Sequence, residues 1–102
     1  MDKEKLINAI IEALVSYLEP ERIILFGSRA KKGGHGYSDF DIAMEGVDMD
    51  IRAERKIKEI LDDKMKIYTV DLIDLDRADN EFRNIVYKTG KVLYERGSKV
   101  LT

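Results

Sequence analysis

The chain has 102 residues, of which 44% are hydrophobic and 37% charged, with a net charge of -2 and no cysteine. This composition is typical of one small globular domain, residues 1–102; it excludes disulfides and zinc–thiolate sites and argues against nucleic acid as a partner. Because no apolar run approaches the roughly 18 residues of a membrane span and no signal peptide is recognisable, we expect a cytoplasmic protein with no membrane partner.

The first predicted element is a helix over residues 2–18, in which apolar side chains recur at every third or fourth position. Asp2 is placed to cap this helix, and Pro20 ends it. Residues 22–27 form a short β-branched and aromatic run that ends in glycine, which predicts a buried strand. The glycines within residues 31–38 then predict a loop.

The remaining elements follow without a long linker. Residues 39–45 (DFDIAME) predict a second strand, because apolar and polar side chains alternate along them. A second helix fits residues 50–63, and residues 66–75 have the composition of a third strand. A third helix fits residues 79–89, with an aspartate as its cap and a glycine after its end, and residues 91–95 form a last short strand.

The order α-β-β-α-β-α-β predicts an α+β fold: a single small domain with a mixed sheet of about four strands and helices packed on it. A helix joins the second and third strands, which favours parallel pairing there, whereas a loop joins the first two strands and favours antiparallel pairing. Uncovered strand edges in so small a sheet favour a homodimer or a complex with another protein. The tyrosines of the predicted helices and strands are expected to pack in the interior: Tyr17, Tyr68, Tyr87 and Tyr94.

Two carboxylates lie one residue apart in the predicted second strand, Asp39 and Asp41. They point to the same face, roughly 7 Å apart, because alternate residues of a strand share a face. Such a pair repels itself unless one carboxylate takes a proton or a cation lies nearby. Because Mg²⁺ prefers oxygen ligands and commonly binds one or two carboxylates together with substrate phosphates, the pair predicts a Mg²⁺–nucleotide site.

The same Asp-x-Asp spacing occurs twice more, at Asp48/Asp50 and at Asp74/Asp76. These pairs fall where a helix is expected to begin and where a strand is expected to end. Acidic residues are favoured there as caps and as surface charge, so neither pair predicts a site.

The first strand ends in Gly27 and Ser28, in front of a basic loop that contains Arg29 and Lys32. Glycine lets the backbone approach a phosphate closely, and exposed N–H groups at such a turn bind anions. An ordinary strand end followed by a serine cap is the alternative interpretation. The basic side chains would add positive charge beside a phosphate.

Ten residues separate Gly27-Ser28 from Asp39-Phe40-Asp41. This combined pattern resembles the signature of the DNA polymerase beta-like nucleotidyltransferase superfamily. Within that superfamily the chain is similar to the minimal nucleotidyltransferase (MNT) domains that are often encoded beside a HEPN-domain protein. The resemblance spans nearly the whole chain, but Lys31-Lys32-Gly33 stands where the family often has Arg-Gly.

The resemblance implies a third carboxylate on the strand after the second helix. Asp71 is the best candidate, because it shares one strand face with Thr69 and Ile73 and would be costly to bury without a partner. Asp74 lies nearer the strand end and fits a capping or solvated residue. A surface charge on an edge strand remains the alternative for Asp71.

The resemblance further implies a Mg²⁺-dependent nucleotidyltransferase that moves a nucleoside monophosphate, AMP from ATP, onto a hydroxyl acceptor. The implied acceptor is a HEPN-domain toxin, which would make the chain an antitoxin. Two other interpretations stay open: a nucleotide-binding or partner-binding subunit of a HEPN/MNT complex without turnover, and a metal- or phosphate-binding domain of unrelated function. The implied site consists of Asp39, Asp41 and Asp71 as catalytic carboxylates that bind one or two Mg²⁺ ions, and of Gly27, Ser28, Arg29 and Lys32 as phosphate-binding residues.

Overall fold

The computed structural model describes residues 3–27 and 38–97. Its helices and strands follow the predicted order, with one additional turn of 3-10 helix, η2, before the last helix. No helix in the described ranges is long and apolar enough to cross a membrane. The elements are α1 (Lys3–Leu18), β1 (Arg22–Phe26), β2 (Phe40–Glu45), α2 (Ile51–Met65), β3 (Val70–Asp74), η2 (Leu75–Arg77), α3 (Asn80–Thr89) and β4 (Lys91–Glu95).

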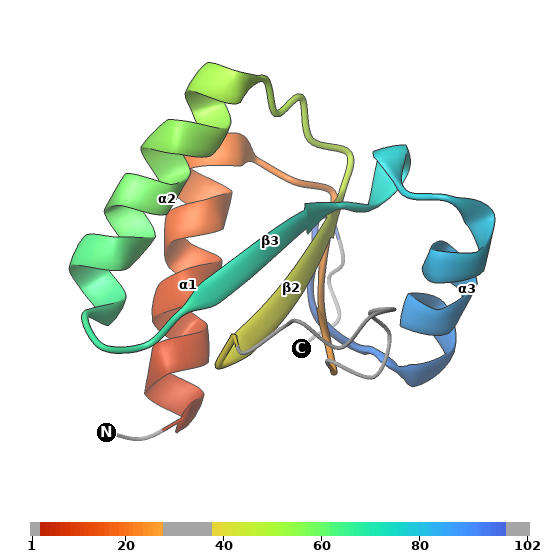
Figure 1. Ribbon diagram of the computed structural model, residues 1–102, viewed down its shortest axis with the longest axis horizontal. Helices are drawn as coiled ribbons and strands as arrows, with labels where there is room; N and C mark the ends of the chain where they lie inside the picture. The colour runs from red at the N-terminus through yellow and green to blue at the C-terminus, as the bar shows by residue number, and fades with distance from the viewer. Residues whose placement is uncertain (1–2, 28–37, 98–102) are drawn as a thin grey trace.

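The four strands form one mixed sheet in the order β3-β2-β1-β4 (Figure 1). β1 is antiparallel to both of its neighbours, whereas β2 and β3 are parallel. α2 connects the two parallel strands, as expected, because a parallel pair needs a crossover connection. Both pairings predicted from the connections are therefore confirmed.

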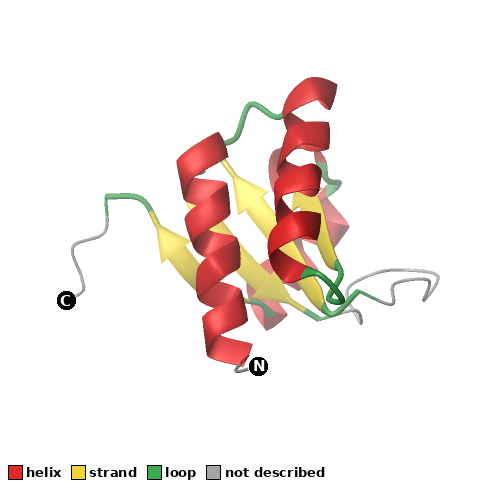
Figure 2. Ribbon diagram, turned by 90° about the vertical axis from the view of Figure 1, so that its left-hand side faces the viewer, coloured by secondary structure: helices red, strands yellow, loops and turns green. Residues whose placement is uncertain are grey.

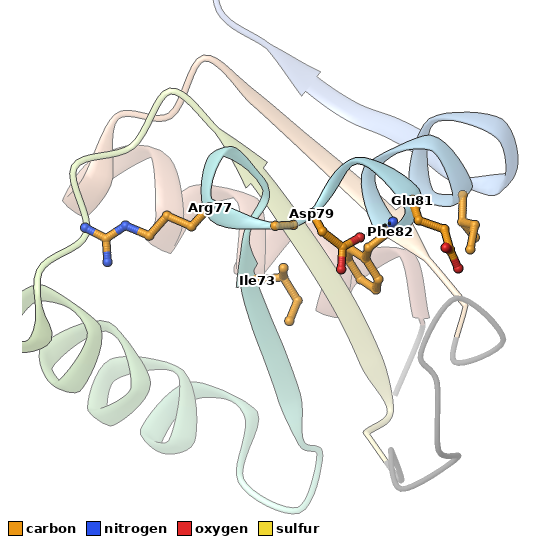
Figure 3. Close-up of a pocket in the computed structure, with 7 residues that line it drawn as sticks. Ile73, Arg77, Asp79, Glu81 and Phe82 are labelled. Carbon is orange, nitrogen blue, oxygen red and sulfur yellow. Dashed lines mark hydrogen bonds between the residues drawn. The ribbon is translucent and has the colours of Figure 1, made fainter.

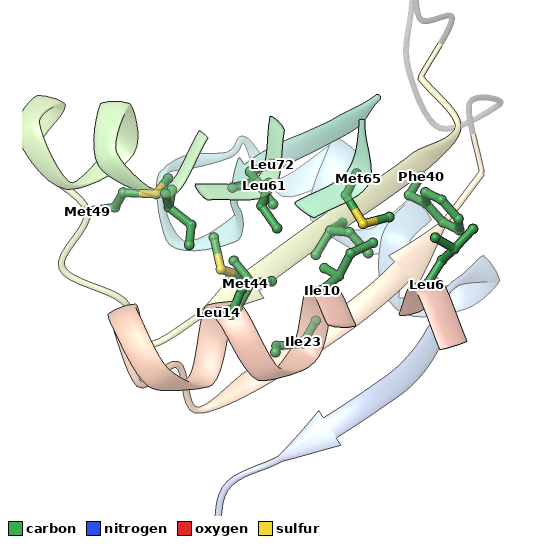
Figure 4. Close-up of a cluster of buried hydrophobic side chains, with 13 residues drawn as sticks. Leu6, Ile10, Leu14, Ile23, Phe40, Met44, Met49, Leu61, Met65 and Leu72 are labelled. Atoms are coloured by element: carbon green, nitrogen blue, oxygen red, sulfur yellow. The ribbon is translucent and has the colours of Figure 1, made fainter. Parts of the chain in front are cut away.

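Helices cover both faces of the sheet: α1 and α2 lie side by side on one face, and α3 lies on the other (Figures 1 and 2). The larger core lies beneath α1 and α2 (Figure 4), with Ile10, Leu14 and Ile57 fully buried. The sheet contributes Phe40, Ile42 and Met44 to this core, which is the alternation predicted for β2. The amphipathic pattern of the first two helices therefore decides which face they cover.

A smaller core lies beneath α3 on the opposite face of the sheet. Ala43 of β2 and Val86 of α3 are fully buried in it. The ring of Phe26 packs edge to face against Phe82, with 5.6 Å between the ring centroids. The odd-numbered positions of β2 consequently face α3, and this face carries the aspartate of the strand interior.

The polar and glycine residues expected at three helix ends have the predicted capping roles. Asp50 and Asp79 cap α2 and α3 by accepting hydrogen bonds from Ala53 N at 2.8 Å and Phe82 N at 2.7 Å. Gly90 ends α3, as predicted, and its N–H donates to Val86 O at 2.7 Å. The predicted cap Asp2 lies outside the described residues.

Three predictions about local structure are corrected. The third strand begins at Val70 rather than at residue 66, because α2 extends to Met65 and its last turn continues through Lys66, which has a φ of 58°. β2 begins one residue late, at Phe40. Tyr17 and Tyr87 are not packing residues, since 48% and 47% of their surfaces are exposed.

Candidate active site

Asp41 and Asp71 lie side by side in the sheet. They occupy the same register position of the parallel strands β2 and β3, and neighbouring strands are about 4.8 Å apart. Both share a face with residues of the smaller core, Ala43 and Ile73, so both face α3. Asp41 is the buried polar residue of the described chain, with 5% of its surface exposed, and Asp71 is half-buried.

Asp39 lies just before β2 and is held by Thr69, which lies just before β3. Its Oδ2 accepts hydrogen bonds from Thr69 N at 2.9 Å and Thr69 Oγ1 at 3.3 Å. Its own N–H is directed at Thr69 O and Oγ1, at 3.0 and 3.2 Å. Since Thr69 lies two residues before Asp71, this set of bonds joins the beginnings of the two strands that carry the carboxylates.

The three predicted carboxylates thus lie at one end of the sheet, but they do not form a single cluster. Within residues 3–27 and 38–97 no three His, Cys, Asp or Glu side chains stand close enough to hold a metal ion together. Asp41 and Asp71 form the adjacent pair, and Asp39 is oriented by Thr69.

The pair Asp41 and Asp71 fits a divalent metal ion by its chemistry. Two carboxylates on one face, one of them buried, repel each other, and a hard cation with oxygen ligands relieves that repulsion. Two protein carboxylates also leave ligand positions for phosphate oxygens, which is the usual way in which Mg²⁺ is held at nucleotide sites.

An open hollow of about 450 Å³ lies where β1 ends and β2 and β4 begin. We call it the strand-end hollow. Gly27, one of the four predicted phosphate-binding residues, lines it, whereas Ser28, Arg29 and Lys32 lie outside the described residues. Its polar and charged lining consists, among the described residues, of Lys3, Ser38, Asp39, Asp41, Thr89 and Lys91, and Gly27 and apolar side chains complete it.

Two cations in the strand-end hollow, Lys3 and Lys91, were missed in the sequence. They come from the first and last described elements, so no local spacing relates them to the aspartates. The only available signal was the topology itself: an antiparallel β4 beside β1 places its first residue, Lys91, opposite Leu25 near the end of β1.

A second cavity, of about 420 Å³, lies between β3 and α3 (Figure 3). Ile73, Phe82 and Ile85 provide its apolar lining, and charged side chains surround its mouth. Ile73 follows Asp71 by two residues on the same strand face, but neither Asp41 nor Asp71 lines this cavity.

The other two Asp-x-Asp pairs are structural, as predicted. Asp50 caps α2. Asp74 caps η2 through a 3.1 Å bond from Asp76 N, and Arg77 lies 3.5 Å from its carboxylate. Asp76 accepts a 2.8 Å hydrogen bond from Gly46 N, which fixes the turn after β2.

A mixed four-stranded sheet with adjacent aspartates at the start of two parallel strands defines a small α+β domain with a carboxylate pair at one end of its sheet. The model of the family "Polymerase beta, Nucleotidyltransferase" matches residues 8–99. The chain belongs to this family.

Within this family, the chain is similar to individual proteins whose names indicate a toxin–antitoxin system or an adenylyltransferase. The chain is 31% identical over 94 residues to the Haemophilus influenzae protein named "Probable protein adenylyltransferase MntA", covering 90% of this chain and 82% of that protein. It is also similar to a chain in the solved structure of tri-AMPylated Shewanella oneidensis HEPN toxin in complex with MNT antitoxin, at 29% identity and a TM-score of 0.72, covering 92% of this chain and 73% of the other. A toxin–antitoxin crystal structure with AMP-PNP matches at 32% identity and a TM-score of 0.68, covering 88% and 73%.

Proposed function

We propose that the protein is a Mg²⁺-dependent nucleotidyltransferase that transfers AMP from ATP to a hydroxyl group of a HEPN-domain partner, and that it acts as an antitoxin. Membership of the nucleotidyltransferase family supports nucleotidyl transfer. The name of the Haemophilus influenzae relative and the AMPylated toxin of a similar complex support AMP as the transferred group and a HEPN protein as the acceptor.

The observation that carries this proposal is the alignment of Asp41 with Asp71 on one face of the sheet. Two neighbouring carboxylates, one of them buried, repel each other, and a bound divalent cation relieves that repulsion. When bound, Mg²⁺ would stabilise negative charge on the oxygens that enter and leave at the α-phosphate. Asp39, Asp41 and Asp71 would hold one or two such ions.

The residues of the chain have separate parts in the proposed reaction. Asp71, on the edge strand, would lie beside the acceptor and take the proton from its hydroxyl. The acceptor oxygen forms a bond to the α-phosphorus, the bond to the β-phosphate oxygen breaks, and pyrophosphate leaves. Gly27 would let the backbone approach the phosphates, and Ser28, Arg29 and Lys32 would add a hydroxyl and positive charge.

The acceptor side of the site is suited to a partner protein. β3 is an edge strand of the sheet, so Asp71 has only one neighbouring strand within the described part of the chain. A partner that approaches this edge would bring a hydroxyl side chain to the carboxylates and cover the strand edge at the same time. A cytoplasmic location is part of this proposal.

The test is transfer of label from ATP to a co-expressed HEPN partner in the presence of Mg²⁺. The expected result is labelled partner with the wild-type chain and at least a hundredfold less with Asp41→Asn, because metal-assisted charge stabilisation is worth several kcal/mol. Asp48→Asn makes the same chemical change at an exposed position and should transfer normally. A tight complex that never becomes labelled would instead identify a binding subunit without turnover.

A further inference from the structure

Lys91 and Lys3 bring positive charge into the strand-end hollow from two directions. Lys91 is the first residue of β4, and Lys3 is the first described residue of α1. Thr89, at the end of α3, lines the hollow between them and the aspartates, but its hydroxyl already donates to Ile85 O at 2.7 Å. Ser38 also lines the hollow with a hydroxyl group, so Lys3 and Lys91 are its cationic donors among the described residues.

No described carboxylate holds either lysine, a property that they share with most described cations of the chain. Within residues 3–27 and 38–97, neither Lys3 nor Lys91 forms an ion pair. Both side chains are exposed to solvent. Cations that do have carboxylate partners in that part of the chain are Arg22, Lys66, Arg77 and Arg96.

The hollow thus carries charges of both signs in separate places. Asp39 and Asp41 line it on the β2 side, and Lys91 lines it on the β4 side. A free anion would be repelled by the carboxylates and a free cation by the ammonium groups. A ligand that itself combines a divalent cation with a polyanion matches both sides, and a magnesium-bound triphosphate is such a ligand.

The spacing across the sheet also fits such a ligand. Phe26 of β1 pairs with Asp41 on the face that α3 covers, and Leu25 of β1 pairs with Lys91 on the face that α1 covers. Two steps between neighbouring strands separate Lys91 from Asp41, which is roughly 10 Å between the backbones. The strand-end hollow opens to both faces beside Gly27, so the long side chain of Lys91 can meet, at the end of β1, phosphates that extend from a metal ion near Asp41.

We infer that Lys91, assisted by Lys3, binds the β- and γ-phosphates of the nucleoside triphosphate. This inference rests on the proposed function and adds binding residues that lie outside the Gly-Ser loop. It also assigns a direction to the substrate: the phosphates extend from Asp41 past the end of β1 towards β4. The α-phosphate then stays beside Asp71, at the opposite edge of the sheet, where the acceptor arrives.

The experiment compares the binding of ATP, tripolyphosphate and AMP by calorimetry in the presence of Mg²⁺. Lys91→Gln should weaken binding of ATP and tripolyphosphate about tenfold, the value of a charged hydrogen bond. AMP lacks the β- and γ-phosphates, so its binding should not change. Lys3→Gln should act in the same direction as Lys91→Gln, and Lys91→Arg should restore most of the affinity.

Lys88→Gln is the matched control, because it removes the same charge from an exposed position three residues before Lys91. It should leave all three affinities unchanged. The inference is wrong if Lys91→Gln binds ATP like the wild type, or if it weakens AMP as much as ATP. Either result, together with normal label transfer, would leave the proposed function standing. A wild-type chain that binds neither ATP nor tripolyphosphate would overturn both.

Discussion

Asp41 of β2 and Asp71 of β3 stand at the same register position of two parallel strands and face the same helix, α3. The strand spacing alone places their backbones about 4.8 Å apart. Asp41 is buried there, and Asp71 is half-buried at the edge of the sheet. Binding of a divalent cation would turn the repulsion between them into attraction, so folding stability should depend on Mg²⁺.

The first prediction concerns Mg²⁺-dependent stability and Asp41. Mg²⁺, added with a non-hydrolysable ATP analogue, should raise the melting temperature of the wild-type chain. One site filled at about 100 times its Kd stabilises the folded state by about 2.7 kcal/mol. Asp41→Asn should lose most of this rise, because an amide is a weaker ligand and carries no charge. Differential scanning fluorimetry measures it.

Asp48→Asn is the control for this prediction. Asp48 is exposed and begins another Asp-x-Asp pair, so the substitution is chemically identical. It should keep the full Mg²⁺-dependent rise. An Asp41→Asn variant that gains as much stability from Mg²⁺ as the wild type would refute the metal assignment.

The aspartate pair shows which features of the site can be predicted from the sequence and which cannot. The predicted alternation of β2 is confirmed, because Phe40, Ile42 and Met44 pack in the larger core and Ala43 packs in the smaller one. Strand parity groups Asp71 with Ile73 in the same way. The pairing of Asp41 with Asp71 could not be predicted, because the register between β2 and β3 depends on how α2 crosses the sheet. Periodicity is local, whereas register is set by long-range packing.

Two further errors have local physical causes. Asp39 was assigned to a strand, yet its carboxylate bonds to Thr69 at the beginning of the strand, outside the ladder. The predicted start of the third strand overlooked the continuation of α2, since Lys66 adopts a positive φ without being glycine. The place of Lys91 in the strand-end hollow has a non-local cause instead. The antiparallel pairing of β4 with β1 brings it near Gly27, and no local pattern in the sequence indicates that pairing.

The second prediction concerns Thr69 as a positioning residue for Asp39. Thr69→Val removes the hydroxyl that lies 3.3 Å from Asp39 Oδ2 and keeps the shape of the side chain. Mg²⁺ affinity should fall about tenfold, the lower end of what loss of an outer partner of a metal ligand costs. Calorimetric titration with Mg²⁺ measures this without turnover. Thr69→Ser should recover the affinity, and an unchanged affinity in the valine variant would argue that Thr69 only closes the loop.

The third prediction concerns Gly90, where the chain has no room for a side chain. A Cβ there would lie 2.5 Å from Ile24 Cγ2 and 2.6 Å from Val86 O, and both residues are buried. Gly90→Ala should therefore destabilise the fold by about 1–3 kcal/mol through overpacking, seen as a lower midpoint of urea unfolding. Gly97 meets nothing within 4 Å, and Gly97→Ala should lose less, only the strain of its φ of +79°. Equal losses in the two variants would show that the close approach at Gly90 relaxes freely.

The last prediction concerns Tyr87 and alkaline pH. The Tyr87 hydroxyl donates a short hydrogen bond to Glu45, and Arg22 lies 3.0 Å from the other oxygen of that carboxylate. The hydrogen bond to Glu45 raises the pKa of Tyr87 above its ordinary 10.0, with burial as a smaller cause. Because the folded state holds the phenol proton more tightly than the unfolded chain, the bond stabilises the fold fully below pH 10 and less as the pH rises through the folded pKa.

The free-energy difference between the wild type and Tyr87→Phe should accordingly depend on pH. At pH 7 the wild type should be more stable by about 1 kcal/mol, the net value of one hydrogen bond. Between pH 10 and 12 this difference should shrink towards zero, because the ionised phenolate can no longer donate and is repelled by Glu45. Urea unfolding at a series of pH values measures it. Tyr17 is equally exposed, so the difference for Tyr17→Phe should stay flat over the same range; a flat difference for Tyr87→Phe would show that the Glu45 bond contributes no stability in solution.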